Sequence, residues 1–296
     1  MCSILIRFNI FLLCSAFISI SNAEQVAINV PPKEGIQNLS SLKANLIIPE
    51  GSAGKVPAVV VLHSGGGIDG TGMPYIEQIN KAGIATLEVD MFARGAAIPI
   101  RNAVPYAYAS FNFLASHPKI DAARIGIMGF SYGAILSLLS VSSDQTASYL
   151  SDGRKFAAHA ALYPACWVHA AISKGETDLR SNETNRDFTG ITADTYQRTT
   201  GSRILLLAGE RDSYDDPDSC QQFVVSLPDN TKSTYKLIVY AGAGHGWDSP
   251  HDKNYRHYAA NKGRGGMVNH HGNKDTAAQS RNEVVTFFKE TLLTKH

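Results

Sequence analysis

The sequence predicts one α/β domain built on a doubly wound, mostly parallel sheet with helices on both faces. Short apolar runs bounded by glycine or polar residues alternate with longer stretches of helical periodicity, which is the pattern of βαβ units. Several polar residues also stand directly after an apolar run, where the carboxyl ends of parallel strands share one edge. A chain of 296 residues with 44% hydrophobic content can form one such unit. We expect it to span residues 24–296.

The first half of the chain alternates regularly between the two kinds of segment. Strands are predicted over residues 42–48, 58–62 and 84–89. Helices are predicted over residues 73–82 and 105–116. Such alternation implies parallel pairing through right-handed crossovers.

The second half continues the alternation but contains two irregular stretches. Strands are predicted over residues 124–128, 158–162, 203–208 and 235–240, and helices over 134–142, up to Leu227 and over 282–293. Residues 167–200 are polar and too long for an ordinary connection, so they form either a lid or a floppy insertion. Residues 249–277 contain several His and Asp, but their spacing matches no zinc pattern, which favours a solvated loop without metal.

The most informative motif is Gly129-Phe130-Ser131-Tyr132-Gly133, which follows one predicted strand and precedes a small-residue helix. With 25 glycines in the chain, the pattern alone has a sizeable chance background. Its strand-turn-helix setting is that of a nucleophile elbow, which exposes the serine hydroxyl above a sheet. Ser131 is therefore the predicted nucleophile.

Two partners follow the next strands along the chain. Asp212 stands after the strand at 203–208, and His245 lies in a glycine-rich loop after the strand at 235–240. A serine needs a histidine to take its proton and a carboxylate to orient that histidine. The order Ser, Asp, His is that of α/β-hydrolases. The nearby acids at positions 215, 216 and 218 could instead cap the next helix, and Asp212 itself could belong to that group.

The remaining site residues are inferred from their positions near the same edge. The developing oxyanion needs fixed donors, for which we expect the Tyr132 amide and the Gly65 amide of the loop His63-Ser64-Gly65-Gly66-Gly67. Phe92 and Trp167 follow strands on this edge and are candidates for contact with substrate.

Taken together, the elbow, the segment Asp121 to Gly126 before it, the acid loop from Gly209 to Asp212 and the segment Gly242 to Asp248 resemble the dienelactone hydrolase family of α/β-hydrolases. The resemblance covers nearly the whole chain after residue 23 and implies hydrolysis of esters or lactones without a cofactor. Tyr163-Pro164-Ala165-Cys166 looks like an exported branch of that family. Family members carry a Cys nucleophile and a His-Glu loop, whereas this chain has Ser131 and His63-Ser64.

Other functions remain open on the same motifs. Prolyl-oligopeptidase-type peptidases and acyltransferases share such a triad, and a non-catalytic binding protein could keep the fold. Gly65 to Gly70 also satisfies G-x-G-x-x-G after a strand, which would suit an NAD(P)-binding protein. The net charge of +1 gives no field for nucleic acid, so we expect a small ester or lactone as partner, with the oligomeric state open.

The N-terminus is expected to be a signal peptide over residues 1–23. Arg7 precedes an apolar stretch, and Ser21-Asn22-Ala23 offers small residues for cleavage before Glu24. The expected product is a periplasmic or secreted protein without a stable membrane anchor. Cleavage leaves two cysteines, Cys166 and Cys220, which we expect to form a disulfide in an oxidising compartment.

Overall fold

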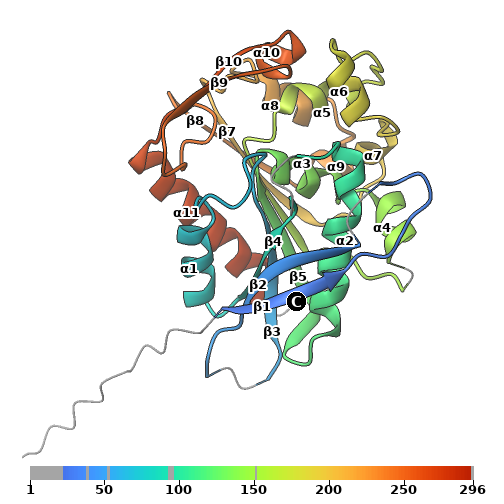
Figure 1. The fold of residues 1–296 in the computed structure, drawn as a ribbon, viewed down its shortest axis with the longest axis vertical. Coiled ribbons are helices and arrows are strands. Elements are labelled where there is room, and N and C mark those ends of the chain that lie inside the picture. Colours follow the sequence, from blue (N-terminus) through green and yellow to red (C-terminus); the bar gives the residue numbers. More distant parts are fainter. Residues whose placement is uncertain (1–22, 38–39, 52–53, 93–96, 151, 295–296) are drawn as a thin grey trace, which may run out of the picture.

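An eight-stranded sheet forms the centre of the molecule (Figure 1). The computed structural model describes residues 23–37, 40–51, 54–92, 97–150 and 152–294. The strands of the sheet are β1 (Glu24–Asn29), β2 (Ser41–Ile47), β3 (Val56–Leu62), β4 (Ala85–Asp90), β5 (Ile120–Phe130), β6 (Ala158–Leu162), β7 (Arg203–Gly209) and β8 (Tyr235–Tyr240). Their spatial order is β1-β2-β4-β3-β5-β6-β7-β8.

The sheet is parallel from β4 through β8 and antiparallel at one edge. β1 pairs antiparallel with β2, and β2 pairs antiparallel with β4. All other pairs are parallel, so the carboxyl ends of β3, β5, β6, β7 and β8 lie at one edge. β3 and β6 are buried at every position, as expected for continuous apolar strands covered on both faces. The predicted doubly wound class is confirmed.

Helices cover both faces of the sheet. The helices are α1 (Met73–Lys81), α2 (Ile100–Ser116), α3 (Tyr132–Leu139), α4 (Ser143–Tyr149), α5 (Cys166–Ser173), α6 (Asn182–Asp187), α7 (Asp194–Gln197), α8 (Ser219–Val225), α9 (Asp229–Lys232), α10 (Ala260–Gly263) and α11 (Lys274–Phe288). α1 and α11 pack on one face around Tyr75, Ile79 and Phe287. α2, α3, α5 and α8 supply the apolar core of the other face.

Three helices begin earlier than the sequence predicts, α3 by only two residues, at Tyr132. α2 begins at Ile100 instead of Pro105, because Ile100, Ala103 and Val104 are buried and offset the one hydrogen bond that an internal proline removes. α11 begins at Lys274 instead of Asn282, because the Asn273 side chain caps this end of the helix by accepting from the Thr276 amide at 3.0 Å. α11 ends in a π-helical turn, Lys289–Leu293.

The two irregular stretches are more ordered than expected. Residues 167–200 contain most of α5 together with α6 and α7, so the floppy alternative is wrong. Residues 249–277 are not a solvated loop either. They form a separate antiparallel hairpin of β9 (Lys253–His257) and β10 (Gly266–His270), joined by the short turn α10. Polar side chains alternating along β9 hide it from a search for apolar runs.

Among the helices that the structure describes, none is long and apolar enough to cross a membrane. The predicted signal peptide lies outside the described residues except for Ala23. β1 begins at Glu24, the residue after the expected cleavage site.

Candidate active site

Ser131 stands at the turn between β5 and α3, with a backbone φ of 49°. The turn is tight because two glycines let other backbone segments approach. A Cβ on Gly129 would lie 2.1 Å from the Gly133 carbonyl carbon, and one on Gly133 would lie 2.3 Å from the Leu62 oxygen. The Ser131 amide donates to the Leu162 carbonyl at 2.9 Å, which fixes the turn against β6. This is the local geometry predicted for the elbow.

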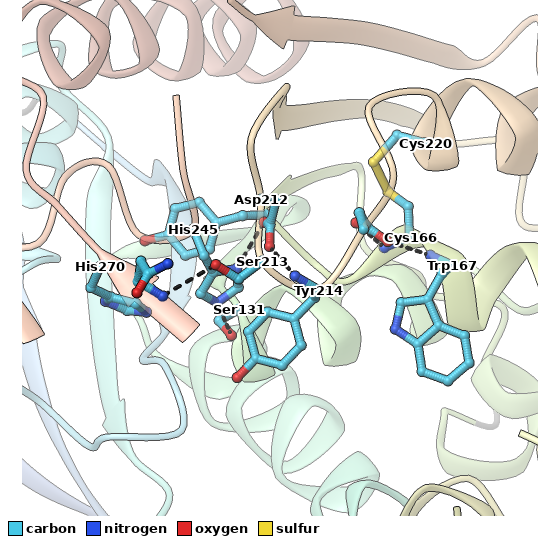
Figure 2. A network of polar contacts seen from close by, with 12 residues as sticks. Ser131, Cys166, Trp167, Asp212, Ser213, Tyr214, Cys220, His245 and His270 are labelled. Atoms are coloured by element: carbon cyan, nitrogen blue, oxygen red, sulfur yellow. Dashed lines mark hydrogen bonds and ion pairs between the residues drawn. A yellow bond between two sulfur atoms is a disulfide. The ribbon is translucent and has the colours of Figure 1, made fainter. Parts of the chain in front are cut away.

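The structure brings Ser131, His245 and Asp212 into one hydrogen-bonded chain (Figure 2). His245 Nε2 lies 2.8 Å from Ser131 Oγ, and His245 Nδ1 lies 2.8 Å from Asp212 Oδ2. A carboxylate can only accept, so Nδ1 carries the proton and Nε2 is free to accept from the serine hydroxyl. Asp212 and His245 are 5% and 1% exposed, so water does not compete for these bonds.

Asp212, rather than a neighbouring acid, is the carboxylate at His245. Its second oxygen, Oδ1, accepts from the Tyr214 amide at 2.9 Å. Asp215 instead accepts from the Cys166 and Trp167 amides, both at 2.7 Å. Asp216 pairs with Lys262, while the N-cap residue Asp218 accepts from the Gln222 side chain at 2.8 Å. Each of the four carboxylates in this cluster therefore has its own partners.

A second buried carboxylate anchors the loop that carries His245. Asp248 accepts from the Tyr75 hydroxyl at 2.7 Å and from the Tyr163 hydroxyl at 2.6 Å. Burial raises the pKa of Asp248, and the two phenols oppose that effect. Trp247, fully buried, donates to Ser280 Oγ at 3.1 Å. These contacts tie the loop to α1, α11 and the end of β6.

A pocket of about 680 Å³ opens beside Ser131, which is large enough for a small organic substrate. Tyr132 and Gly65 line it, as expected for the two predicted oxyanion donors. The Tyr132 amide belongs to the first residue of α3, where helical geometry supplies no intrahelical acceptor. The pocket is therefore adjacent to both predicted donors.

The two predicted substrate contacts differ in position. Trp167 lines the pocket. Phe92 is not among the lining residues; its ring packs edge-on against His63 at 4.7 Å and Tyr132 at 5.0 Å. Direct contact of Phe92 with the pocket is therefore not seen, and the ring supports the wall from behind.

Several pocket residues escaped the sequence analysis because they come from α6 and the residue after it, from the hairpin, and from the turn after Asp212. The additional polar and aromatic lining residues are Thr184, Arg186, Asp187, Phe188, Tyr214, Lys253, Tyr255, His257, Tyr258 and His270. Alternation of Lys253, Tyr255 and His257 at every second position was the available signal, since one face of a strand repeats with that period.

Two of these residues pack directly on His245. The Tyr214 ring lies 4.5 Å and the His270 ring 5.1 Å from the His245 ring, centroid to centroid. Burial and the neighbouring His245 and Lys253 lower the pKa of His270 to about 3, so this ring is neutral. With the Tyr163 ring, which lies 4.9 Å away, His245 therefore has three uncharged ring neighbours beside its carboxylate.

The glycine loop after β3 is part of this pocket and lacks the surroundings expected for a dinucleotide. Ser64, Gly65 and Gly66 line the same pocket as Ser131. In dinucleotide-binding proteins an acid about 20 residues after the glycine loop binds the ribose. Glu88 stands at that distance, but it is buried, and its carboxylate lies 3.1 Å from the position of a Cβ on Gly72, the N-cap of α1. An acidic group at that helix end would repel a pyrophosphate.

The predicted disulfide between Cys166 and Cys220 is present. It joins the start of α5 to α8 across a sequence separation of 54 residues. Asp215 lies near both sulfurs, but thiols joined in a disulfide are not available as metal ligands. The bridge holds the segment with Trp167 next to the turn that follows Asp212 (Figure 2).

A mostly parallel sheet with a serine at a strand-turn-helix and later acid and histidine loops defines an α/β-hydrolase. The sequence profile of the dienelactone hydrolase family matches residues 42–292, and the chain belongs to this family of ester and lactone hydrolases. It is 25% identical over 222 residues to a probable 2-oxo-3-(5-oxofuran-2-ylidene)propanoate lactonase from a Bradyrhizobium species, covering 70% of this chain and 79% of that protein.

Solved structures share the fold at low sequence identity. Est1E from Butyrivibrio proteoclasticus is 16% identical with a TM-score of 0.61, covering 91% of this chain and 99% of that one. Thermogutta terrifontis esterase 2, phosphoramylated by tabun, is 16% identical with a TM-score of 0.63, covering 92% and 97%. The predicted family and fold are confirmed, and the catalytic roles of the individual residues stay predictions.

Proposed function

We propose that the protein hydrolyses small carboxylic esters or lactones through an acyl-enzyme formed on Ser131. The observation that carries this proposal is the hydrogen-bonded chain from Asp212 through His245 to the Ser131 hydroxyl, with both distances at 2.8 Å. An isolated serine is a poor nucleophile at neutral pH, and this arrangement supplies the base that it lacks.

The proposed reaction has two halves. Ser131 Oγ attacks the ester carbonyl while its proton moves to His245 Nε2, and the tetrahedral intermediate collapses when that proton passes to the departing alcohol oxygen. A water then gives a proton to His245 and attacks the acyl carbon, and the proton returns to Ser131 Oγ as the acid leaves. Asp212 holds the imidazole and stabilises its charged form in both halves.

The oxyanion of each intermediate is proposed to accept from the amides of Tyr132 and Gly65. Both residues line the pocket beside Ser131. Donors fixed before the reaction stabilise the charge without reorganisation, and losing one typically costs about 100- to 1,000-fold in kcat.

The pocket supports a small substrate with apolar or aromatic parts. Its lining includes Ile98, Ile135, Val168 and Phe188 together with the aromatic residues of the hairpin. Relatives named as a lactonase and as esterases agree with the proposed bond type. These features support the type of bond that is hydrolysed, and not one particular acid or alcohol.

A fluorophosphonate probe and a panel of nitrophenyl esters of graded chain length test the proposal. We expect the probe to label the wild type and not Ser131→Ala, and the ester activity to disappear in the same variant. An unlabelled wild type would remove the serine-hydrolase assignment. Labelling with activity confined to peptide amides would favour a peptidase, and product appearing only with an alcohol acceptor would favour an acyltransferase.

We also propose that the mature protein is exported. The Cys166–Cys220 disulfide supports this, because such bonds persist in oxidising compartments. Mass spectrometry of the protein from its natural host tests the proposal: a mature N-terminus at Glu24 is expected, whereas an intact N-terminus in a cytoplasmic fraction would contradict it.

A further inference from the structure

His63, the residue that leads into the glycine loop, uses both of its ring nitrogens on backbone groups. Its Nδ1 lies 2.7 Å from the Ser64 carbonyl oxygen, and its Nε2 lies 2.9 Å from the Met91 amide nitrogen. The residue is 5% exposed, so these bonds are shielded from water. It takes no part in the proposed proton transfers, which leaves its role to be explained.

The two partners determine the protonation state of this ring. A carbonyl oxygen only accepts, so Nδ1 must carry the hydrogen; an amide only donates, so Nε2 must be bare. Burial lowers the pKa of His63, and the carboxylates of Asp90, at 3.9 Å, and Asp69 oppose this shift. Asp69 and a third acid, Glu88, line a small cavity beside the ring. The neutral Nδ1–H form satisfies both bonds.

The bond from Nδ1 fixes more than a carbonyl. The Ser64 carbonyl also accepts from the Gly67 amide at 3.1 Å, so two donors hold this oxygen in place. Because the peptide unit is planar and trans, the Gly65 N–H belongs to the same plane as the Ser64 C=O and points the opposite way. Holding the oxygen therefore aims the Gly65 hydrogen.

The backbone of His63 also contacts the elbow. Its carbonyl oxygen accepts from the Gly133 amide at 3.2 Å, next to Tyr132 in α3. One residue thus connects the elbow, through its carbonyl, with the glycine loop, through its side chain.

We propose that His63 is a positioning residue that aims the Gly65 amide at the oxyanion through its Nδ1–H bond to the Ser64 carbonyl. This inference rests on the proposed function. It makes the bond from Nδ1 the one that matters for catalysis, while the bond at Nε2 only attaches the loop to the end of β4.

Two isosteric variants separate the two bonds. In His63→Asn the side-chain amide nitrogen lies near the position of Nδ1 and keeps a donor for Ser64. In His63→Gln the amide oxygen lies near the position of Nε2 and keeps an acceptor for Met91, but the donor to Ser64 is lost. We expect His63→Gln to lower kcat by about 10- to 100-fold with KM changed by less than about 3-fold, and His63→Asn to keep most of kcat.

An arylboronic acid gives a readout that a structural role would not move. It forms a tetrahedral adduct with a serine, and one boron oxygen takes the place of the oxyanion. Its affinity should fall in His63→Gln by the same factor as kcat, while the affinity for the product acid stays constant. Equal kcat in the Asn and Gln variants, or equal losses of boronate and product binding, would overturn the inference.

Two further measurements keep the result interpretable. If wild-type turnover does not depend on Ser131, the proposed function fails; if it does but His63→Gln keeps full kcat, only the role of His63 fails. Should a variant not fold, ¹⁵N-histidine NMR of the wild type replaces it. The expected signal is a neutral ring with hydrogen on Nδ1, and hydrogen on Nε2 would overturn the inference.

Discussion

At the scale of single residues, Ser131 combines an unfavourable backbone conformation with a side chain that lines the pocket. A φ of 49° is uncommon for a residue other than glycine. It persists because Gly129 and Gly133 remove the steric conflicts around it and because the Ser131 amide bonds to Leu162. The strain is local, and the surrounding sheet compensates for it.

The first prediction concerns Asp212. In Asp212→Asn the amide oxygen can still accept from the Tyr214 amide, but an NH₂ group then faces His245 Nδ1 and favours the wrong tautomer. We expect kcat to fall by about 1,000- to 10,000-fold with little change in melting temperature. Ester kinetics and thermal melting check this.

The matched control is Asp216→Asn, which changes an acid in the same turn that pairs with Lys262 and lies away from His245. We expect this variant to keep nearly full kcat. Similar losses in the two variants would mean that the turn tolerates no amide there, and Asp212 would lose its assigned role.

At the scale of elements, the pattern of apolar residues predicted every strand from β2 to β8. Strands buried on both faces, such as β3 and β6, leave continuous apolar runs, whereas β2 alternates buried and exposed positions. It failed for β9, whose pocket-facing side chains Lys253, Tyr255 and His257 are polar. The start of α2 was missed because Pro105 suggests a helix beginning, whereas the deciding factor is tertiary burial of the turn before it. Ser131, Asp212 and His245 were found because each follows a recognisable strand.

The second prediction concerns the disulfide between α5 and α8. The double variant Cys166→Ser, Cys220→Ser loses a crosslink over 54 residues, for which the loop-entropy argument gives on the order of 4 kcal/mol. We expect a loss of about 2–4 kcal/mol in the free energy of unfolding, measured with urea. We also expect a lower kcat/KM, because the bridge holds Trp167 beside the turn after Asp212.

Reducing agent provides the control. Dithiothreitol should lower the stability of the wild type to that of the double variant and leave the double variant unchanged. A wild type that is indifferent to reductant under unfolding conditions would contradict the assigned crosslink.

At the scale of the whole molecule, buried ionisable groups link stability to pH. Burial lowers the pKa of His159 to about 4 from its ordinary 6.5, and His159 Nδ1 lies 3.1 Å from the Ser137 carbonyl. The unfolded chain binds a proton at this residue below pH 6.5, while the folded chain does not until about pH 4. Stability contributed by the neutral ring is therefore present above pH 6.5 and is lost as pH falls toward 4.

The third prediction follows from this sign. Between pH 7 and pH 5, His159→Leu should lose less unfolding free energy than the wild type, by about 2 kcal/mol. The buried carboxylates Asp215 and Asp248, whose pKa values are raised, act in the opposite direction but equally in both proteins. Urea titrations at the two pH values check this, and parallel losses would contradict the assigned burial effect.

The hairpin of β9 and β10 has an evolutionary consequence. Its strands pair only with each other among the described elements. Hydrogen bonds attach it to the turn after Asp212, such as those from the Asn269 amide to Ser213 Oγ at 3.1 Å and from the Lys262 amide to the Tyr214 carbonyl at 3.0 Å. It nevertheless provides one wall of the pocket. Exchange of its other pocket-facing residues, leaving His270 packed on His245, would alter which molecules fit without disturbing Ser131 or the sheet beneath it. Changes of substrate preference among descendants of this chain should therefore concentrate in the hairpin, while the sheet and Ser131 stay the same.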